Sequence, residues 1–166
     1  AVVVAVVVLA MAAGAWWLLR PAPRVPATTL SLSGWFADVA IAPAGPLVAV
    51  VRRVSPVGPG VVEVFANDAG APAWRDTGGR GASGLAWSGE AARLGYARDD
   101  AALGRVWITV TSPGPSAVVD TRPLPPALAA ATSFAWRGDQ AIIAGGVPGG
   151  GLIEWSLADG TLRPLT

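Results

Sequence analysis

A strand–turn–strand pattern recurs three times along the chain, and it restricts the fold more than any other feature. The copies lie at residues 38–50, 84–96 and 133–143, and each has an alternating strand, a turn of small residues and a second apolar strand. Ile41, Trp87 and Trp136 hold equivalent positions, so the repeat advances by 46 and then by 49 residues. A period of about 40–50 residues that contains only strands is typical of a β-propeller.

Each copy continues into two more predicted strands, which are separated by turns rich in Gly, Pro, Asn, Asp and Ser. In the first unit these strands are predicted at 61–65 and 73–77. The second unit predicts strands at 85–88, 94–97, 106–111 and 117–121, and the third at 134–137, 141–144, 152–157 and 162–166. The spacing of Thr77, Thr121 and Thr166, at 44 and 45 residues, predicts a common register for the fourth strands.

The sequence therefore predicts an all-β fold, a partial β-propeller of three four-stranded blades at about residues 35–80, 81–123 and 130–166. Residues 21–34 are predicted to form a Pro-rich linker and a lead-in strand, since Pro21, Pro23 and Pro26 stiffen this stretch. Propellers usually close with about four to eight blades. We expect either a truncated propeller or an assembly that completes the ring between chains.

The first nineteen residues, Ala1–Leu19, contain no charged side chain and are long enough to span a bilayer as a helix. Trp16, Trp17 and Arg20 follow the order of an interfacial aromatic belt and a snorkelling charge. Residues 1–20 are therefore predicted to be a transmembrane helix or signal anchor. The alternatives are a cleaved signal peptide, for which residues 10–15 offer small-residue cleavage sites, and a buried core helix.

Composition excludes several kinds of chemistry. The chain has no Cys and no His, and all twelve basic residues are Arg. Disulfides, thiol nucleophiles, the usual general base and the commonest zinc ligands are therefore absent, as is Schiff-base chemistry through Lys. Beyond residue 30 the charges nearly balance, with ten Arg against eleven acids, so no basic footprint indicates a nucleic-acid partner.

No residue is predicted to be catalytic, cofactor-binding or metal-ligating. Asp99 and Asp100 form the one adjacent acidic pair, and we interpret them as a solvated turn because a calcium site needs six to eight oxygens. Asp76, Asp120 and Asp159 are interpreted as turn formers or as cross-strand partners of Arg. Ser88 has no His to activate it, and residues 78–81 and 145–151 lack the pattern of a phosphate loop, so they are interpreted as hairpin loops.

The tryptophans are interpreted as packing residues rather than as a stacking site for a ligand. Two sets of equivalent first-strand residues are the expected fillers between blades: Ile41, Trp87 and Trp136, and Val39, Leu85 and Phe134. Trp107 and Trp155 on third strands receive the same interpretation. Trp35 and Trp74 are expected to be freer to face solvent.

The repeat resembles the WD40-like β-propeller repeat of the TolB type, in which an apolar strand leads to Ser-Pro-Asp-Gly and then to Lys/Arg-x-Leu-Ala-Tyr. The closest copy is Leu85-Ala86-Trp87-Ser88-Gly89-Glu90 followed by Arg93-Leu94-Gly95-Tyr96. The first copy keeps Ala42-Pro43-Ala44-Gly45, and the third keeps Arg137-Gly138-Asp139. The resemblance covers about residues 35–166. It implies a bacterial envelope protein whose propeller is a platform for protein interaction or sensing.

These observations predict a membrane-anchored, non-catalytic propeller that binds a protein partner at the bacterial cell envelope. Arg20 and Arg24 alone favour a cytoplasmic position for the propeller, whereas the resemblance favours a periplasmic or extracellular one. One alternative is the extracytoplasmic sensor half of a larger receptor, with a kinase or DNA-binding domain upstream. Another is the propeller part of a hydrolase whose catalytic domain is missing. No cofactor is expected.

Overall fold

The computed structural model describes residues 32–66, 70–78, 80–90 and 92–165. These residues form three four-stranded antiparallel sheets and one short 3-10 helix, Pro126–Leu128. The predicted membrane helix at residues 1–20 lies outside the described residues, as does the linker except for residues 32–34, which form no strand. Among the residues that the structure describes, no helix is both long and apolar enough to cross a bilayer.

In every sheet the strands lie side by side in chain order, and each strand pairs antiparallel with the next. Sheet 1 consists of β1 (Trp35–Ile41), β2 (Leu47–Arg53), β3 (Gly60–Ala66) and β4 (Trp74–Arg75). Sheet 2 consists of β5 (Arg80–Trp87), β6 (Arg93–Asp100), β7 (Gly104–Thr111) and β8 (Val118–Pro123). Sheet 3 consists of β9 (Ser133–Arg137), β10 (Ala141–Gly145), β11 (Leu152–Ser156) and β12 (Leu162–Leu165). For the residues that the structure describes, the prediction of an all-β fold with three four-stranded sheets is confirmed.

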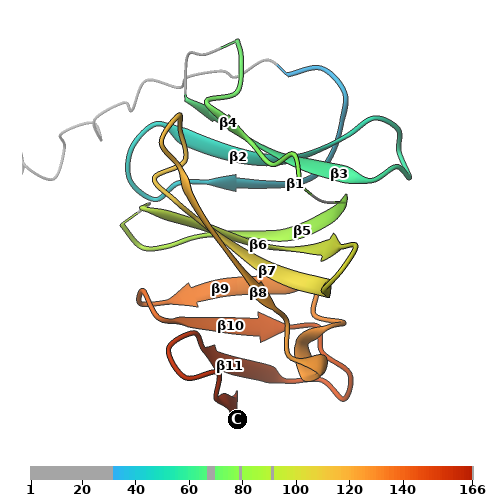
Figure 1. Cartoon of the computed structure of the whole chain (residues 1–166), viewed down its shortest axis with the longest axis vertical. Helices are drawn as coiled ribbons and strands as arrows, with labels where there is room; N and C mark the ends of the chain where they lie inside the picture. The colour runs from blue at the N-terminus through green and yellow to red at the C-terminus, as the bar shows by residue number, and fades with distance from the viewer. Residues whose placement is uncertain (1–31, 67–69, 79, 91, 166) are drawn as a thin grey trace, which may run out of the picture.

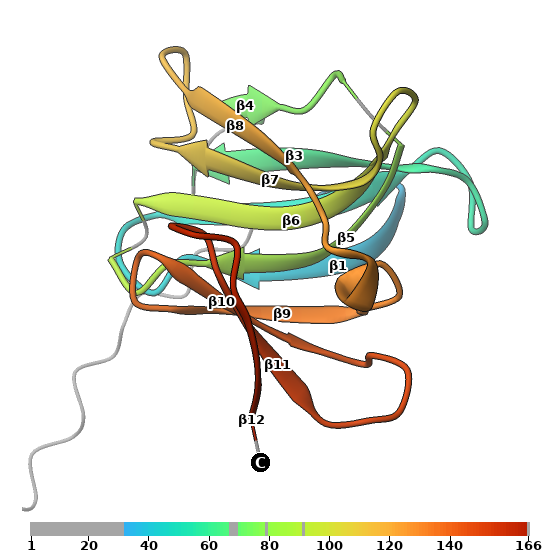
Figure 2. The ribbon, with the colours of Figure 1, turned by 60° about the horizontal axis from the view of Figure 1, so that its bottom comes forward.

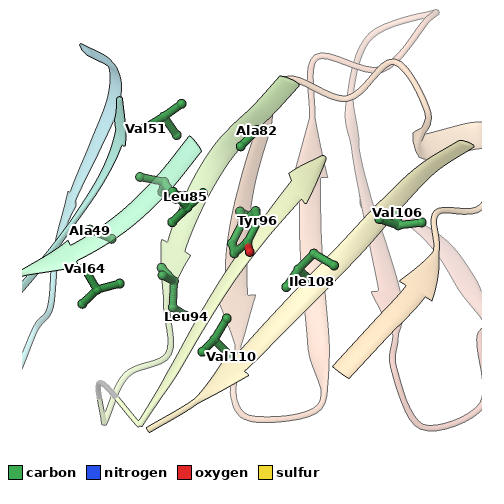
Figure 3. Packing of buried hydrophobic residues seen from close by; sticks show 11 residues of the cluster. Ala49, Val51, Val64, Ala82, Leu85, Leu94, Tyr96, Val106, Ile108 and Val110 are labelled. Atoms are coloured by element: carbon green, nitrogen blue, oxygen red, sulfur yellow. The ribbon is translucent and has the colours of Figure 1, made fainter. Parts of the chain in front are cut away.

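The three sheets follow one another along the long axis of the molecule, with sheet 2 between the other two (Figure 1). In the view of Figure 2, turned by 60°, sheets 1 and 2 overlap. Two apolar clusters fill the interfaces. The first joins sheets 1 and 2, where Ala49, Val51 and Val64 face Leu85, Leu94 and Tyr96 (Figure 3). The second joins sheets 2 and 3 and includes Ala97, Trp107, Leu128, Phe134, Ile142 and Trp155. Alternate residues of each strand point to opposite faces, so sheet 2 contributes side chains to both clusters.

Equivalent tryptophans connect successive sheets in the same way. Trp87 of sheet 2 donates its indole N–H to the backbone carbonyl of Ala40 in sheet 1, at 3.0 Å. Trp136 of sheet 3 donates to the carbonyl of Ala86 in sheet 2, also at 3.0 Å. Because Ala40 and Ala86 immediately precede the repeat positions Ile41 and Trp87, the two interfaces reproduce one geometry.

We expect Trp87→Phe and Trp136→Phe to lower the free energy of unfolding by similar amounts, about 1–2 kcal/mol each. Phenylalanine keeps an aromatic ring at the interface but removes the N–H that crosses it. Guanidinium chloride unfolding followed by far-UV circular dichroism measures both effects, and the exposed Trp35→Phe serves as the control. A clear loss for one variant without the other would contradict the equivalence of the two interfaces.

Two glycines allow close approach at the interface between sheets 2 and 3. A Cβ added to Gly95 would lie 2.1 Å from Cζ2 of Trp107, whose indole lies across this backbone. Gly84 has φ of +68°, and a Cβ there would lie 2.5 Å from Cδ2 of Phe134. Larger residues at either position would push the aromatic side chains out of the cluster.

The prediction that Val39 and Ile41 fill a space between sheets is wrong. Val39 is 56% exposed and Ile41 is 73% exposed. The strand register puts both on the face of β1 that points away from sheet 2, whereas Ala40 between them packs towards sheet 2. Their equivalents Leu85 and Phe134 are buried, because sheets 2 and 3 each have a preceding sheet to cover that face.

Two expectations about the fourth strands are also wrong. Trp74 is partly buried and packs against the cluster between sheets 1 and 2 instead of facing solvent. Thr121 pairs with Ile108, and Glu63, the residue of β3 that is equivalent to Ile108, pairs with Arg75. The residue equivalent to Thr121 is therefore Arg75 and not Thr77. Thr166 lies outside the described residues. Strand β4 is only two residues long, so sequence spacing located it poorly.

Candidate functional site

A cavity with a volume of about 630 Å³ lies at one end of sheet 1. The ends of β2, β3 and β4 line it, together with the first residues after β4. Its charged lining residues are three arginines and two acids: Arg52, Arg53, Arg75, Glu63 and Asp76. The cavity therefore carries a formal charge of +1.

Glu63 is the unusual residue of this cavity. It lies at the centre of β3 and is only 1% exposed. Arg75 on the neighbouring strand donates two hydrogen bonds to Glu63 Oε1, one from Nε at 2.9 Å and one from Nη2. Arg52 approaches from the other side, with Nη1 3.5 Å from Glu63 Oε2. Arg52 and Arg75 therefore both pair with the buried carboxylate of Glu63. A buried charge without such a partner would be strongly destabilising.

Two buried polar atoms of the cavity lack a hydrogen-bond partner among the described residues: Oε2 of Glu63 and Nε of Arg53. The Arg53 guanidinium is otherwise held by the loop before β3, since its Nη1 donates to the Pro56 carbonyl at 3.0 Å. Buried donors and acceptors without partners cost free energy, and they are uncommon outside functional positions. Buried atoms without a partner also occur at Arg98, Arg105 and Trp155, so it is the position of the two atoms of Glu63 and Arg53 in the lining of an open cavity that makes this cavity the candidate binding site.

A second polar cluster lies between sheets 1 and 2 and is centred on Asp76. Tyr96 donates its hydroxyl to Asp76 Oδ2 at 2.6 Å, and the Gly78 backbone N–H donates to Asp76 Oδ1 at 2.8 Å. Arg98 Nε lies 3.3 Å from Asp76 Oδ2. Burial, and then the negative charge of Asp76, raises the pKa of Tyr96, so its hydroxyl stays protonated as a donor.

The other predicted acidic residues have structural roles. Asp99 pairs with Arg105 at 3.0 Å, and Asp100 accepts the backbone N–H groups of Ala102 and Leu103, which lowers the pKa of Asp100. Both residues are the last ones of β6, so they lie beside the turn at residues 101–103 and not in it as the sequence predicted.

Asp159 is a turn former as predicted, whereas Asp120 pairs with an arginine of its own strand, β8, and not across strands. Asp120 pairs with Arg122 at 2.7 Å, and Asp159 accepts hydrogen bonds from the backbone and hydroxyl of Thr161. Hydrogen bonds from Ser156 and Thr161 lower the pKa of Asp159. Asp76, in the cluster described above, is likewise the partner of an arginine.

Ser88 and residues 146–151 are parts of turns, whereas Arg80 and Gly81, predicted to lie in a hairpin loop, begin β5. Ser88 is buried, and its Oγ accepts the backbone N–H of Arg93 across the turn between β5 and β6. Residues 146–151 form the loop between β10 and β11. Trp107 and Trp155 are buried and Trp87 and Trp136 pack against the apolar clusters, which confirms the packing interpretation for these four. In the described ranges no three acidic side chains come together as metal ligands.

The cavity itself was not predicted from the sequence. One signal for it was present: Glu63 interrupts the apolar run 61–65 of a strand that the repeat places inside a sheet. A carboxylate at such a position needs a cationic partner, and Arg52 and Arg75 occupy the adjacent strands. Comparisons with protein families, with curated proteins and with solved structures find no match to this chain.

Proposed function

We propose that the three sheets are successive blades of a β-propeller of the TolB-type WD40-like repeat. The support is the repeated interface, in which Trp87 and Trp136 each bind the carbonyl that precedes the equivalent position of the previous sheet. Four-stranded antiparallel units in chain order are the building blocks of propellers. The sequence motif at residues 85–96 supports the same assignment.

We further propose that this propeller is a non-catalytic binding module, anchored in the membrane through residues 1–20 and facing the periplasm or the cell exterior. The binding proposal depends on the cavity beside Glu63. This cavity combines a volume of about 630 Å³ with two buried polar atoms that have no hydrogen-bond partner among the described residues. We propose a protein as the ligand because the repeat resembles that of propellers that serve as platforms for protein interaction. The apolar run of residues 1–19 supports the anchor.

A photo-crosslinking experiment tests both parts in a bacterial host. A photoreactive residue replaces Thr77, an exposed residue of the cavity lining, and in a second variant it replaces the exposed Leu162 of sheet 3. We expect a discrete crosslinked protein from position 77 and none from position 162. We also expect the chain to stay in the membrane fraction after carbonate washing and to be released by detergent.

Two results would contradict these proposals separately. The same crosslinked products from positions 77 and 162 would show that the cavity does not select a partner. Release of the intact chain, with residues 1–20 retained, by carbonate alone would show that these residues are not an anchor.

A further inference from the structure

Arg52 and Arg98 occupy the same register position in neighbouring sheets, but their surroundings differ. Arg52 pairs across its sheet with Val61, and Arg98 pairs with Val106. Two residues earlier, the pairs Val50–Glu63 and Tyr96–Ile108 also correspond. Each arginine therefore stands near the same end of its sheet and on the same face, the one that sheet 2 turns towards sheet 1.

Sheet 2 shows what an arginine at this position binds. The guanidinium of Arg98 is buried and forms an ion pair with the carboxylate of Asp76, a residue at the end of the preceding sheet. The side chain of Arg52 is 40% exposed, and its one carboxylate partner among the described residues, Glu63, belongs to its own sheet. The cavity lies beside Arg52, where the counterpart of Asp76 would enter.

We propose that this cavity binds the carboxylate of an acidic side chain on an extended segment of a partner protein, which reaches Arg52 as Asp76 reaches Arg98. The inference deepens the proposed function and rests on it. Arg53 Nε, a buried donor without a partner, lines the same cavity and supplies a second contact. Guanidinium groups bind carboxylates through short, charge-assisted hydrogen bonds.

Residues 1–31 do not supply this carboxylate. They contain Arg20 and Arg24 but no Asp and no Glu. The lining of the cavity carries a net positive charge, which favours an acidic ligand over a basic one. An acidic segment of a partner protein fits this charge.

The test uses the full chain in an uncharged detergent and two capped heptapeptides that differ in one central residue, aspartate or asparagine. We expect the aspartate peptide to bind at least about tenfold more tightly, because a charge-assisted contact is lost in its counterpart. The Nε–H signal of Arg52 in a nitrogen-15 NMR spectrum should shift during the titration with the aspartate peptide. Arg52→Gln should remove both the preference and the signal.

Two further variants separate this site from general attraction between charges. Arg163→Gln removes an exposed arginine of sheet 3 and should leave the aspartate preference unchanged. Glu63→Gln keeps the shape of the side chain but removes the competing carboxylate, so it should tighten binding of the aspartate peptide about threefold or more. Thermal unfolding of each variant shows that the sheets are intact.

The proposal is overturned if the two peptides bind alike, or if Arg163→Gln weakens binding as much as Arg52→Gln. It is also overturned if inorganic phosphate shifts the Arg52 signal at lower concentration than the aspartate peptide does, since the site would then be one for a free anion. In each case a specific crosslink from position 77 would leave the proposed binding function standing with a different ligand.

Discussion

Replacing Trp107 with alanine is expected to lower the free energy of unfolding by about 3–5 kcal/mol, the usual cost of emptying a buried aromatic site. Trp107 has no solvent exposure and fills the interface between sheets 2 and 3. Its ring centroid lies 5.0 Å from that of Phe134 and 6.2 Å from that of Trp136. Its indole also lies across Gly95, so few neighbouring atoms can move in to fill the cavity.

The measurement is guanidinium chloride unfolding of the full chain in an uncharged detergent, followed by far-UV circular dichroism. Trp35→Ala is the matched control, because the same side chain is removed from an exposed position and should change stability by less than about 0.5 kcal/mol. Equal losses in the two variants would show that the sheets do not pack through Trp107. Peptide amides of sheet 3 should also exchange hydrogen faster in Trp107→Ala, since that sheet loses its apolar support.

The strands could be predicted because they depend on short-range patterns. Alternating apolar residues interrupted by Gly, Pro and Asp turns determine where each hairpin folds back, and a hairpin needs no information from distant residues. The second unit shows this clearly, since strands predicted at 94–97 and 106–111 lie within β6 (Arg93–Asp100) and β7 (Gly104–Thr111). Equivalent first strands were also found correctly through Trp87 and Trp136.

The faces of the first sheet could not be predicted by the same reasoning. Equivalence to Trp87 suggested that Ile41 is buried, but burial depends on whether a sheet covers that face. A repeat shows which residues correspond and not which neighbours each copy has. The same limit applies to β4, where only two paired residues define the register and Trp74 turns towards sheet 2.

The candidate site was harder to predict because its parts come from separate strands. Arg52 and Arg75 reach Glu63 from β2 and β4, and only the register of three strands brings them together. The pairing of Asp76 with Tyr96 and Arg98 crosses from one sheet to the next, over 20 and 22 positions of sequence. Sequence spacing between unlike residues carries no signal for such a contact.

Replacing Asp76 with alanine is expected to lower the free energy of unfolding by about 3–5 kcal/mol, because it leaves a buried guanidinium without its counter-charge. The side chains of Asp76 and Arg98 are 12% and 9% exposed, so water compensates little. The substitution also leaves the Tyr96 hydroxyl and the Gly78 N–H without their acceptor. Asp120→Ala is the matched control: its ion pair with Arg122 is exposed, and we expect a loss of less than about 1 kcal/mol.

Asp76→Asn divides this effect into its charge and its hydrogen bonds. The amide oxygen can still accept from one of the two donors, while the charge that faces Arg98 is removed. A stability near that of Asp76→Ala would show that the charge dominates, and a stability near that of the unchanged protein would show that it contributes little. Losses no larger for Asp76→Ala than for Asp120→Ala would contradict the buried pair. Because Arg98 is the equivalent of Arg52, a dominant charge term is the result that also favours a carboxylate as the ligand of Arg52.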